Sequence, residues 1–194
     1  MTLNNDIQGF VVGLDLSLTG TGVAIIGHHG VSTGLIKSKG KKGDSLASRR
    51  DRLKRIVHQI SMLIPANSLV VIEQPAYSQT GGSHHDRSGL WWLVVELAMD
   101  WGWDVVEITP GGVKKYATGS GNASKDTVLA AVVKRYLDVD VTDNNVADAL
   151  TLAAMGARSL GHPIEKSMPA LNLTAMDAVR WNETAAPAAE ESKS

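Results

Sequence analysis

The chain has 194 residues, of which 43% are hydrophobic, no cysteine and a formal net charge of −1 at pH 7. The lack of cysteine excludes disulfides and thiolate metal sites, and the length favours one globular domain with a substantial core. The polar start lacks a signal-peptide core and no apolar run approaches the ~20 residues that span a bilayer, so we expect a soluble cytoplasmic protein.

The first third of the chain predicts three short strands joined by tight turns. Apolar runs at 10–14, 22–26 and 31–36 are separated by Gly, Thr and His. Connections this short favour antiparallel hairpins. From 46 to 64 the apolar residues recur at helical spacing, and Pro65 ends that helix.

After Pro65 the pattern alternates between strand and helix. In chain order we expect a buried strand at 68–75, a polar Gly-rich loop at 77–89, an apolar helix around 90–102, a strand at 103–108, a loop-rich connection with room for a short helix, and helices at 125–136, 143–160 and 167–182.

Together these elements predict an α/β fold: a mixed five-stranded sheet whose first three strands are antiparallel, with helices on both faces. The order of the elements matches the ribonuclease H-like arrangement, in which carboxylates from the first and fourth strands meet at neighbouring strand ends. We place the main domain at 1–165, a helical extension at 166–182 and a disordered tail at 183–194.

Three acidic residues lie where a carboxylate is costly to desolvate. Asp15 follows one apolar run, Glu73 follows another, and Asp148 lies in the small-residue stretch VADALTLAAMGA. A capping or ion-paired acid explains each one alone equally well, but three like charges buried together need cations. Oxygen ligands favour Mg²⁺ or Mn²⁺, and two such ions roughly 4 Å apart are suited to phosphodiester hydrolysis.

A lysine at the start of a predicted helix indicates an anion site. In GSGNASKDTV, Ser124 is the expected N-cap, which puts Lys125 in the first turn. The helix macrodipole disfavours a cation there unless an anion docks on the exposed N–H groups. Lys114 and Lys115 precede the same loop, and we expect them to contact DNA.

Residues 37–55 hold nine Lys and Arg against two Asp. A solvated surface is the usual explanation of such a run, although the Gly-punctuated segment with Lys41 and Lys42 also suits a DNA-binding arm. His84 and His85 lie in the predicted polar loop, where we expect solvent exposure rather than metal binding.

Three aromatic residues flank these motifs. We expect Trp91 and Trp92 in the core or at a dimer interface. Tyr77, just past the Glu73 strand, is the better candidate for stacking on an unpaired base.

Four motifs spread over residues 9–160 resemble the RuvC-type Holliday junction resolvases, and most closely their phage-encoded members: GLDLSLTGTGVA, VVIEQPAY, VKKYATGSGNASKDTV and VADALTLAAMG. The resemblance implies a homodimeric endonuclease that nicks two symmetry-related strands of a four-way DNA junction with two Mg²⁺ or Mn²⁺ ions per site. For a phage-encoded member the compartment is the host cytoplasm. The resemblance also assigns roles, with metal binding by Asp15, Glu73 and Asp148 and stabilisation of the scissile phosphate by Lys125 and Lys114.

The chain departs from the family pattern at Asn145. The family has Asp or His three residues before the last aspartate, whereas Asn145 can coordinate through its carbonyl oxygen but brings no charge. We therefore count Asn145 among the catalytic and metal-binding residues and expect a weaker second ion. Asp143 is a possible substitute on a different face of the helix. The aromatic residue expected shortly after EQ is displaced to Tyr77.

Three alternative functions stay open. A phosphotransferase of the actin and sugar-kinase type also begins with Asp followed by Gly and Thr, but it needs a second such subdomain. A non-catalytic DNA-binding or scaffold module on the same fold is consistent with Asn145 but not with three retained acids and Lys125. A nuclease of this fold can also act on RNA, flaps or forks instead of four-way junctions.

Overall fold

The computed structural model describes residues 9–75 and 83–181, and its strands form one mixed sheet in the order β3-β2-β1-β4-β5. The strands are β1 Phe10–Asp15, β2 Gly20–Gly27, β3 Gly30–Lys37, β4 Ser68–Glu73 and β5 Asp104–Ile108. The pairs β1–β2 and β2–β3 are antiparallel, and β1–β4 and β4–β5 are parallel. The predicted sheet is confirmed.

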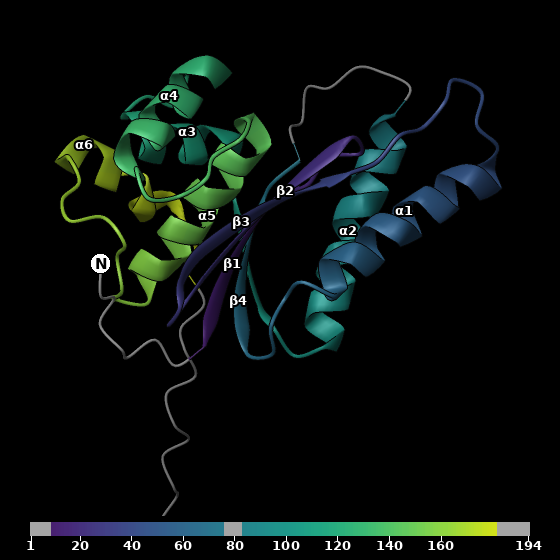
Figure 1. Ribbon diagram of the computed structural model, residues 1–194, viewed down its shortest axis with the longest axis horizontal. Coiled ribbons are helices and arrows are strands. Elements are labelled where there is room, and N and C mark those ends of the chain that lie inside the picture. Colours follow the sequence, from purple (N-terminus) through teal and green to yellow (C-terminus); the bar gives the residue numbers. More distant parts are fainter. Residues whose placement is uncertain (1–8, 76–82, 182–194) are drawn as a thin grey trace, which may run out of the picture.

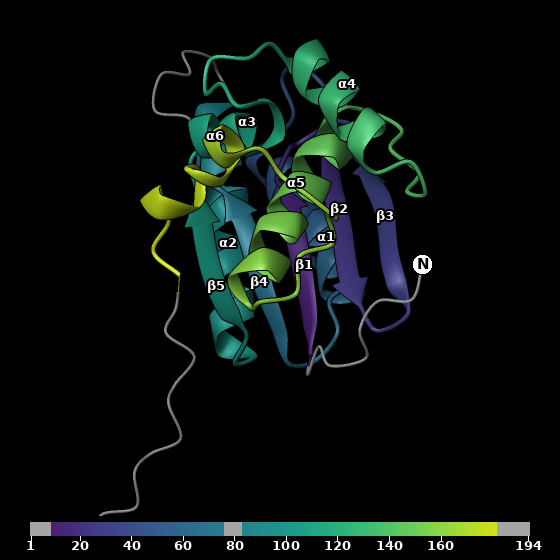
Figure 2. The ribbon, with the colours of Figure 1, turned by 90° about the vertical axis from the view of Figure 1, so that its left-hand side faces the viewer.

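Helices cover both faces of the sheet, as predicted (Figure 1). One face carries α1 Leu46–Ser61 and α2 His84–Asp100. The other carries α3 Pro110–Thr118, α4 Lys125–Arg135, α5 Asn144–Ser159, the single turn α6 Ala170–Leu173 and a 3-10 turn at Met176–Ala178. Figure 2 looks onto this second face, where α5 lies over the central strands. No helix in the described part of the chain is long and apolar enough to span a membrane.

Small residues let α5 lie directly on β1 and β2. A Cβ added at Gly13 would come within 2.0 Å of the Ala149 carbonyl oxygen, and one at Gly22 within 2.0 Å of the Asn145 carbonyl oxygen. Gly22 pairs with Asp15 across β1 and β2. The glycines and alanines therefore bring the first turn of α5 to the strand end that carries Asp15, which no bulkier residue at Gly22 would allow.

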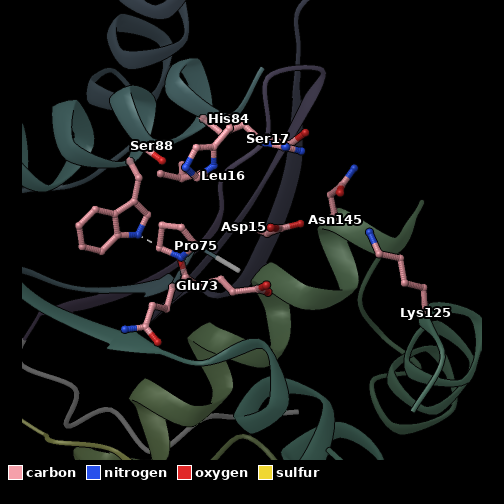
Figure 3. A pocket seen from close by; sticks show the side chains of 12 residues that line it. Asp15, Leu16, Ser17, Glu73, Pro75, His84, Ser88, Lys125 and Asn145 are labelled. Atoms are coloured by element: carbon pink, nitrogen blue, oxygen red, sulfur yellow. Dashed lines mark hydrogen bonds between the residues drawn. The ribbon is translucent and has the colours of Figure 1, made fainter. Parts of the chain in front are cut away.

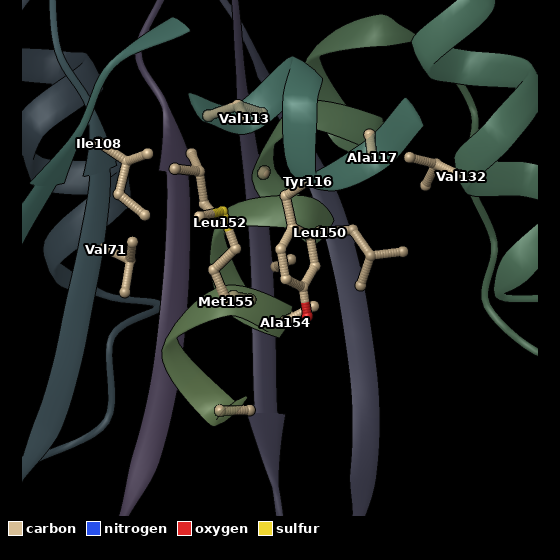
Figure 4. Packing of buried hydrophobic residues seen from close by; sticks show 14 of the residues in the cluster. Val71, Ile108, Val113, Tyr116, Ala117, Val132, Leu150, Leu152, Ala154 and Met155 are labelled. Carbon is tan, nitrogen blue, oxygen red and sulfur yellow. The ribbon is translucent and has the colours of Figure 1, made fainter. Parts of the chain in front are cut away.

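Larger side chains of α5 fill the space beside this close contact. Leu150, Leu152 and Met155 are fully buried and belong to the same core cluster as Val71 of β4 and Tyr116 of α3 (Figure 4). Packing at this density fixes α5 along its whole length, and so fixes the direction in which its polar residues point.

The structure corrects two predicted helices. The helix expected at about 90–102 begins at His84, inside the predicted loop. The prediction missed this start because the first turn is polar and shows no apolar periodicity. The helix expected over 167–182 is wrong, since only α6 and one 3-10 turn form there. Asn172 of α6 is buried and donates a 2.8 Å hydrogen bond to the carbonyl oxygen of Tyr116, so this segment follows the surface of α3 rather than a regular amphipathic helix. The predicted tail falls in residues 182–194, which lie outside the described residues, and the domain boundary at 165 stays a prediction.

Candidate active site

Three acidic side chains converge where β1 and β4 end. Asp15 is the last residue of β1 and Glu73 the last of its parallel neighbour β4, so both lie at the same edge of the sheet. Asp148, in the second turn of α5, is close enough to affect the ionisation of both. Figure 3 shows Asp15 and Glu73 pointing into one cleft, beside Asn145 and Lys125. The structure thus brings together the three acids singled out in the sequence.

The carboxyl groups are held in a setting that opposes their ionisation. Burial, with the Asp148 charge second, raises the pKa of Asp15 to about 7. Burial, followed by the charges of Asp15 and Asp148, raises the pKa of Glu73 to about 8. Burial also raises the pKa of Asp148 to about 6, although Lys125 and Lys114 act in the opposite direction. No hydrogen bond contributes to any of the three shifts, so within the described residues no donor compensates these charges.

The oxygen ligands in this cleft are better suited to binding a hard divalent cation than to sharing protons among themselves. All the candidate ligands are oxygens, two carboxylates share the cleft, and a cation would remove the electrostatic cost that burial imposes. Among residues 9–75 and 83–181, no group of three Asp, Glu or His side chains is close enough together to hold a metal ion as the structure stands. A bound cation would offset the mutual repulsion of the ionised carboxylates and so allow them to approach one another.

Asn145 and Asp143 have different roles at the start of α5. The Asp143 carboxylate caps the helix, where its Oδ1 accepts hydrogen bonds from the backbone N–H groups of Asn145 at 2.9 Å and Val146 at 3.0 Å. The Asp143 charge still contributes to the raised pKa of Asp15. The side chain of Asn145 lines the cleft, so Asn145 rather than Asp143 occupies the position beside the acids.

Lys125 lines the cleft from α4, on the side of Asp15 away from the α2 residues His84 and Ser88 (Figure 3). Ser124 caps α4 as predicted, since its side chain accepts a 3.2 Å hydrogen bond from the Thr127 N–H. Lys125 is therefore the first residue of α4, and its charge acts on all three acids, while that of Lys114 acts on Glu73 and Asp148. Both ammonium groups are placed to meet an anion that approaches the carboxylates.

The remaining predicted DNA contacts do not line this cleft. Lys115 follows Lys114 in α3 and is half-buried, and Lys41 and Lys42 are exposed in the connection between β3 and α1. Two cations of the 37–55 run have structural partners: Arg49 forms an ion pair with Asp86, and Arg52 donates to the Leu18 carbonyl oxygen and to Ser38 Oγ. Tyr77 lies outside the described residues.

The cleft also contains a wall that the sequence did not reveal. The cleft has a volume of about 210 Å³. One of its sides is formed by four residues of α2, namely His84, Arg87, Ser88 and Trp91. Their spacing of three, four and seven residues from His84 is that of one helix face. This periodicity, extended back into the polar HHDRS segment, is the signal that would have placed α2 beside the acids.

Comparisons with known proteins identify the family of this chain. The family model for crossover junction endodeoxyribonuclease RuvC matches residues 11–155. The RuvC of Synechococcus sp. (strain WH7803) is 26% identical over 149 residues, which are 75% of this chain and 96% of that protein. The RuvC of Synechococcus sp. (strain CC9311) is 40% identical over 65 residues, which are 33% of this chain and 40% of that protein.

Two solved structures share the fold. One is the Thermus thermophilus RuvC structure, with a TM-score of 0.56 and 21% identity over 79% of this chain and 97% of that one. The other is T. thermophilus RuvC in complex with Holliday junction substrate, with a TM-score of 0.58 and 17% identity over 80% of this chain and 98% of that one. The ribonuclease H-like fold expected from the order of the elements is confirmed.

Proposed function

The chain belongs to the RuvC family of crossover junction endodeoxyribonucleases, and on that premise we propose that it is a structure-selective endonuclease that resolves Holliday junctions by phosphodiester hydrolysis. The observation that carries the proposal is the convergence of Asp15, Glu73 and Asp148 beside Lys125. A family member of the same fold was solved with a Holliday junction substrate, which supports this choice of DNA.

The acids and Asn145 form the proposed metal site. Asp15, Glu73 and Asp148, together with the amide oxygen of Asn145, would hold two Mg²⁺ or Mn²⁺ ions. When bound, such ions activate water and stabilise the leaving oxygen of a phosphodiester. To accept them, the carboxyl groups must release protons that their raised pKa values retain, so protons and cations compete for this site.

The lysines act on the phosphate. Lys125, across the cleft from Asp15, is placed to hold a non-bridging phosphate oxygen and to stabilise the charge that develops during cleavage. Lys114 reinforces that field from α3. Burial of the carboxylates lowers the local dielectric, which makes each of these charges more effective than it would be in water.

The outer surface of α1 and α2 supports a homodimer. Large apolar side chains are exposed on these helices and directly after their last residues: Leu46, Met62, Leu63, Trp92, Leu93, Met99 and Trp101. Trp92 and Met99 are seven residues apart on one face of α2 and are 64% and 62% exposed. Covering this face with a second copy would give a two-fold enzyme whose two sites match the pseudo-two-fold symmetry of a junction.

The remaining DNA contacts are assigned from the sequence. We assign phosphate contacts to Lys115, Lys41 and Lys42 and base stacking to Tyr77. Origin from a phage and location in the cytoplasm, or in the host cytoplasm for a phage-encoded protein, stay predictions.

One cleavage experiment tests the function. Labelled four-way junction, fork, flap and duplex DNA are incubated with the protein and Mg²⁺, Mn²⁺ or EDTA. We expect paired symmetric nicks in the junction with either metal and none with EDTA. Asp15→Asn should abolish cleavage, whereas Asp104→Asn, which changes an exposed acid at the far end of β5, should not.

Other results would select the alternatives. Junction binding without cleavage in any metal would favour a non-catalytic DNA-binding module. Preferential cleavage of forks, flaps or RNA would give the fold a different substrate. Cleavage that survives Asp15→Asn would refute the proposed site.

A further inference from the structure

An indole hydrogen bond holds the strand end that carries Glu73. Trp91 of α2 donates from Nε1 to the Glu73 carbonyl oxygen at 3.0 Å. The register between β1 and β4 ends at the pair Leu14–Ile72, so no residue of β1 pairs with Glu73. On the other side, the N–H of Gln74 donates to the Ile108 carbonyl oxygen of β5 at 2.8 Å. Trp91 therefore fixes the side of Glu73 that the sheet leaves open.

The position of Trp91 is itself well defined. Its ring packs against the core cluster that contains Ile72, Leu90 and Val94, and it also lines the cleft with Asp15 and Glu73. A ring anchored in this way cannot move far without disturbing α2, so its N–H stays directed at the end of β4.

Trp91 also contacts the outer face of α2. Its ring meets that of Trp92 edge to face, with centroids 4.9 Å apart and an interplanar angle of 90°. Edge-to-face pairs of this kind are favourable, and Trp92 is 64% exposed. The side chain that holds Glu73 is thus in contact with one that a covering subunit would bury.

We propose that Trp91 is a positioning residue for Glu73, and that Trp92 braces it, so that the outer face of α2 and the metal-binding carboxylates are mechanically joined. The inference rests on the proposed function, because it assigns Glu73 to the metal site. Ligands must be held within about half an ångström of their productive geometry, and groups that hold them are therefore expected to affect metal affinity.

Trp91→Phe tests the hydrogen bond while keeping an aromatic ring. Calorimetric titration of the DNA-free protein with Mn²⁺ should show binding weakened by about five-fold, the effect of one lost backbone hydrogen bond. Cleavage of the junction should show kcat lowered by a similar factor with KM unchanged. Trp92→Ala, which removes the brace, should weaken Mn²⁺ binding by about two-fold.

Trp181→Phe is the matched control. Trp181 likewise donates its indole N–H to a backbone carbonyl oxygen, that of Met176 at 3.3 Å, but on the far side of the sheet from α2. Its replacement should leave Mn²⁺ affinity and kcat unchanged. A Trp91→Phe protein that binds Mn²⁺ as the wild type does would overturn the inference, and so would a raised KM at unchanged Mn²⁺ affinity, because Trp91 would then act on DNA.

Two further results are decisive. If Trp91→Phe does not fold, as judged by circular dichroism, unchanged Mn²⁺ affinity in a folded Trp92→Ala protein overturns the inference. A protein that binds Mn²⁺ but does not cut junctions would contradict the proposed function. The Mn²⁺ titration needs no cleavage, so the Mn²⁺ affinities of the variants would still test the role of Trp91.

Discussion

Buried carboxylates occur at two places in this fold, a single one at Glu165 and three at the cleft, and their surroundings differ. Glu165 has a side chain only 1% exposed, yet each of its oxygens has donors. Oε1 accepts from the hydroxyl groups of Tyr116 at 2.9 Å and of Tyr136, and Oε2 accepts from Arg158 Nη2 at 2.9 Å. Asp15, Glu73 and Asp148 instead lie close enough for their charges to interact, and no hydrogen bond contributes to the shifts in their pKa values.

The contrast separates a structural carboxylate from a functional one. Burial and the Glu165 charge raise the pKa values of Tyr116 and Tyr136, so both phenols stay protonated and keep donating. Arg158 adds an opposite charge, which leaves Glu165 with no need of an external cation. Within the described residues the charges of Lys125 and Lys114 lower the pKa values of the cleft acids without a hydrogen bond and leave them raised, so a bound cation is the simplest way to complete the compensation.

The Glu165 group also gives a role to the C-terminal segment. Glu165 and Asn172 both bind Tyr116, through its hydroxyl and its carbonyl oxygen. Residues 161–181 therefore hold α3 against the rest of the fold, and α3 carries Lys114. Glu165 thus stabilises the position of α3, and the cleft acids depend on that position because Lys114 acts on them from α3.

The largest expected effect is on activity. Asp15→Asn should lower junction cleavage by at least about 1,000-fold, because the neutral amide weakens the hold on ions that supply several kcal/mol of transition-state stabilisation. The same change should leave the protein at least as stable in EDTA at pH 8, since it removes one of three repelling charges. A clear loss of stability on chemical denaturation would mean that Asp15 is structural, like Glu165.

The second effect is on stability alone. Glu165→Ala should lower the free energy of unfolding by about 3–5 kcal/mol, because it leaves Arg158 without its buried partner and two tyrosine hydroxyls without their acceptor. Glu165→Gln, which keeps an acceptor, should cost less. Urea unfolding gives both values, and the Mn²⁺ affinity of the folded variants should not change. A weaker Mn²⁺ affinity would show that the two groups are coupled.

The third effect is the response to pH. The folded-state pKa values of the cleft acids, from about 6 to about 8, exceed their ordinary values of 3.8 and 4.5. Between the ordinary and the raised pKa values the folded chain binds more protons than the unfolded chain, so stability falls as pH rises from about 4 to about 8 and levels off above that. In EDTA we expect a decrease of about 1.4 kcal/mol per pH unit for each proton involved. Melting temperatures between pH 5 and 9 measure it.

The matching control for the pH response is the same series with excess Mg²⁺, where the decrease should shrink because the cation replaces the protons. Asp15→Asn should also reduce the slope in EDTA. A melting temperature that rises from pH 6 to pH 8 in EDTA would contradict the raised pKa values.

The smallest expected effect concerns Asn145. Asn145→Asp restores a charge at the position where the family has an acid or histidine, so Mn²⁺ should bind about ten-fold more tightly. In EDTA the variant should be less stable than the wild type, because the added carboxylate joins an uncompensated cluster. Calorimetric titration and thermal unfolding measure the two quantities. Unchanged values for both would place Asn145 outside the metal site.

Much of the fold could be predicted because the signals are local. The signals that predicted its elements each depend on neighbouring residues: the apolar runs at 10–14 and 22–26, the helical spacing in α1 and α5, and the Ser124 cap. The first turn of α2 and the path of residues 167–181 were predicted wrongly, since both have partners that are distant in the chain: Arg49 for Asp86 of α2, and Tyr116 for Asn172.

The sequence by itself determined which side chains have costly positions. Asp15, Glu73 and Asp148 follow or interrupt apolar runs, and that pattern is visible without coordinates. Only the tertiary structure decided which of these costs are compensated. Glu165 is hydrogen-bonded to Tyr116 and Arg158, which lie 49 and 7 residues away in the chain, whereas the charges that act on the cleft acids among the described residues are those of one another, Asp143 and two lysines. Electrostatic compensation depends on distances between groups remote in the chain, and these are set by how Gly13 and Gly22 let α5 settle on the sheet.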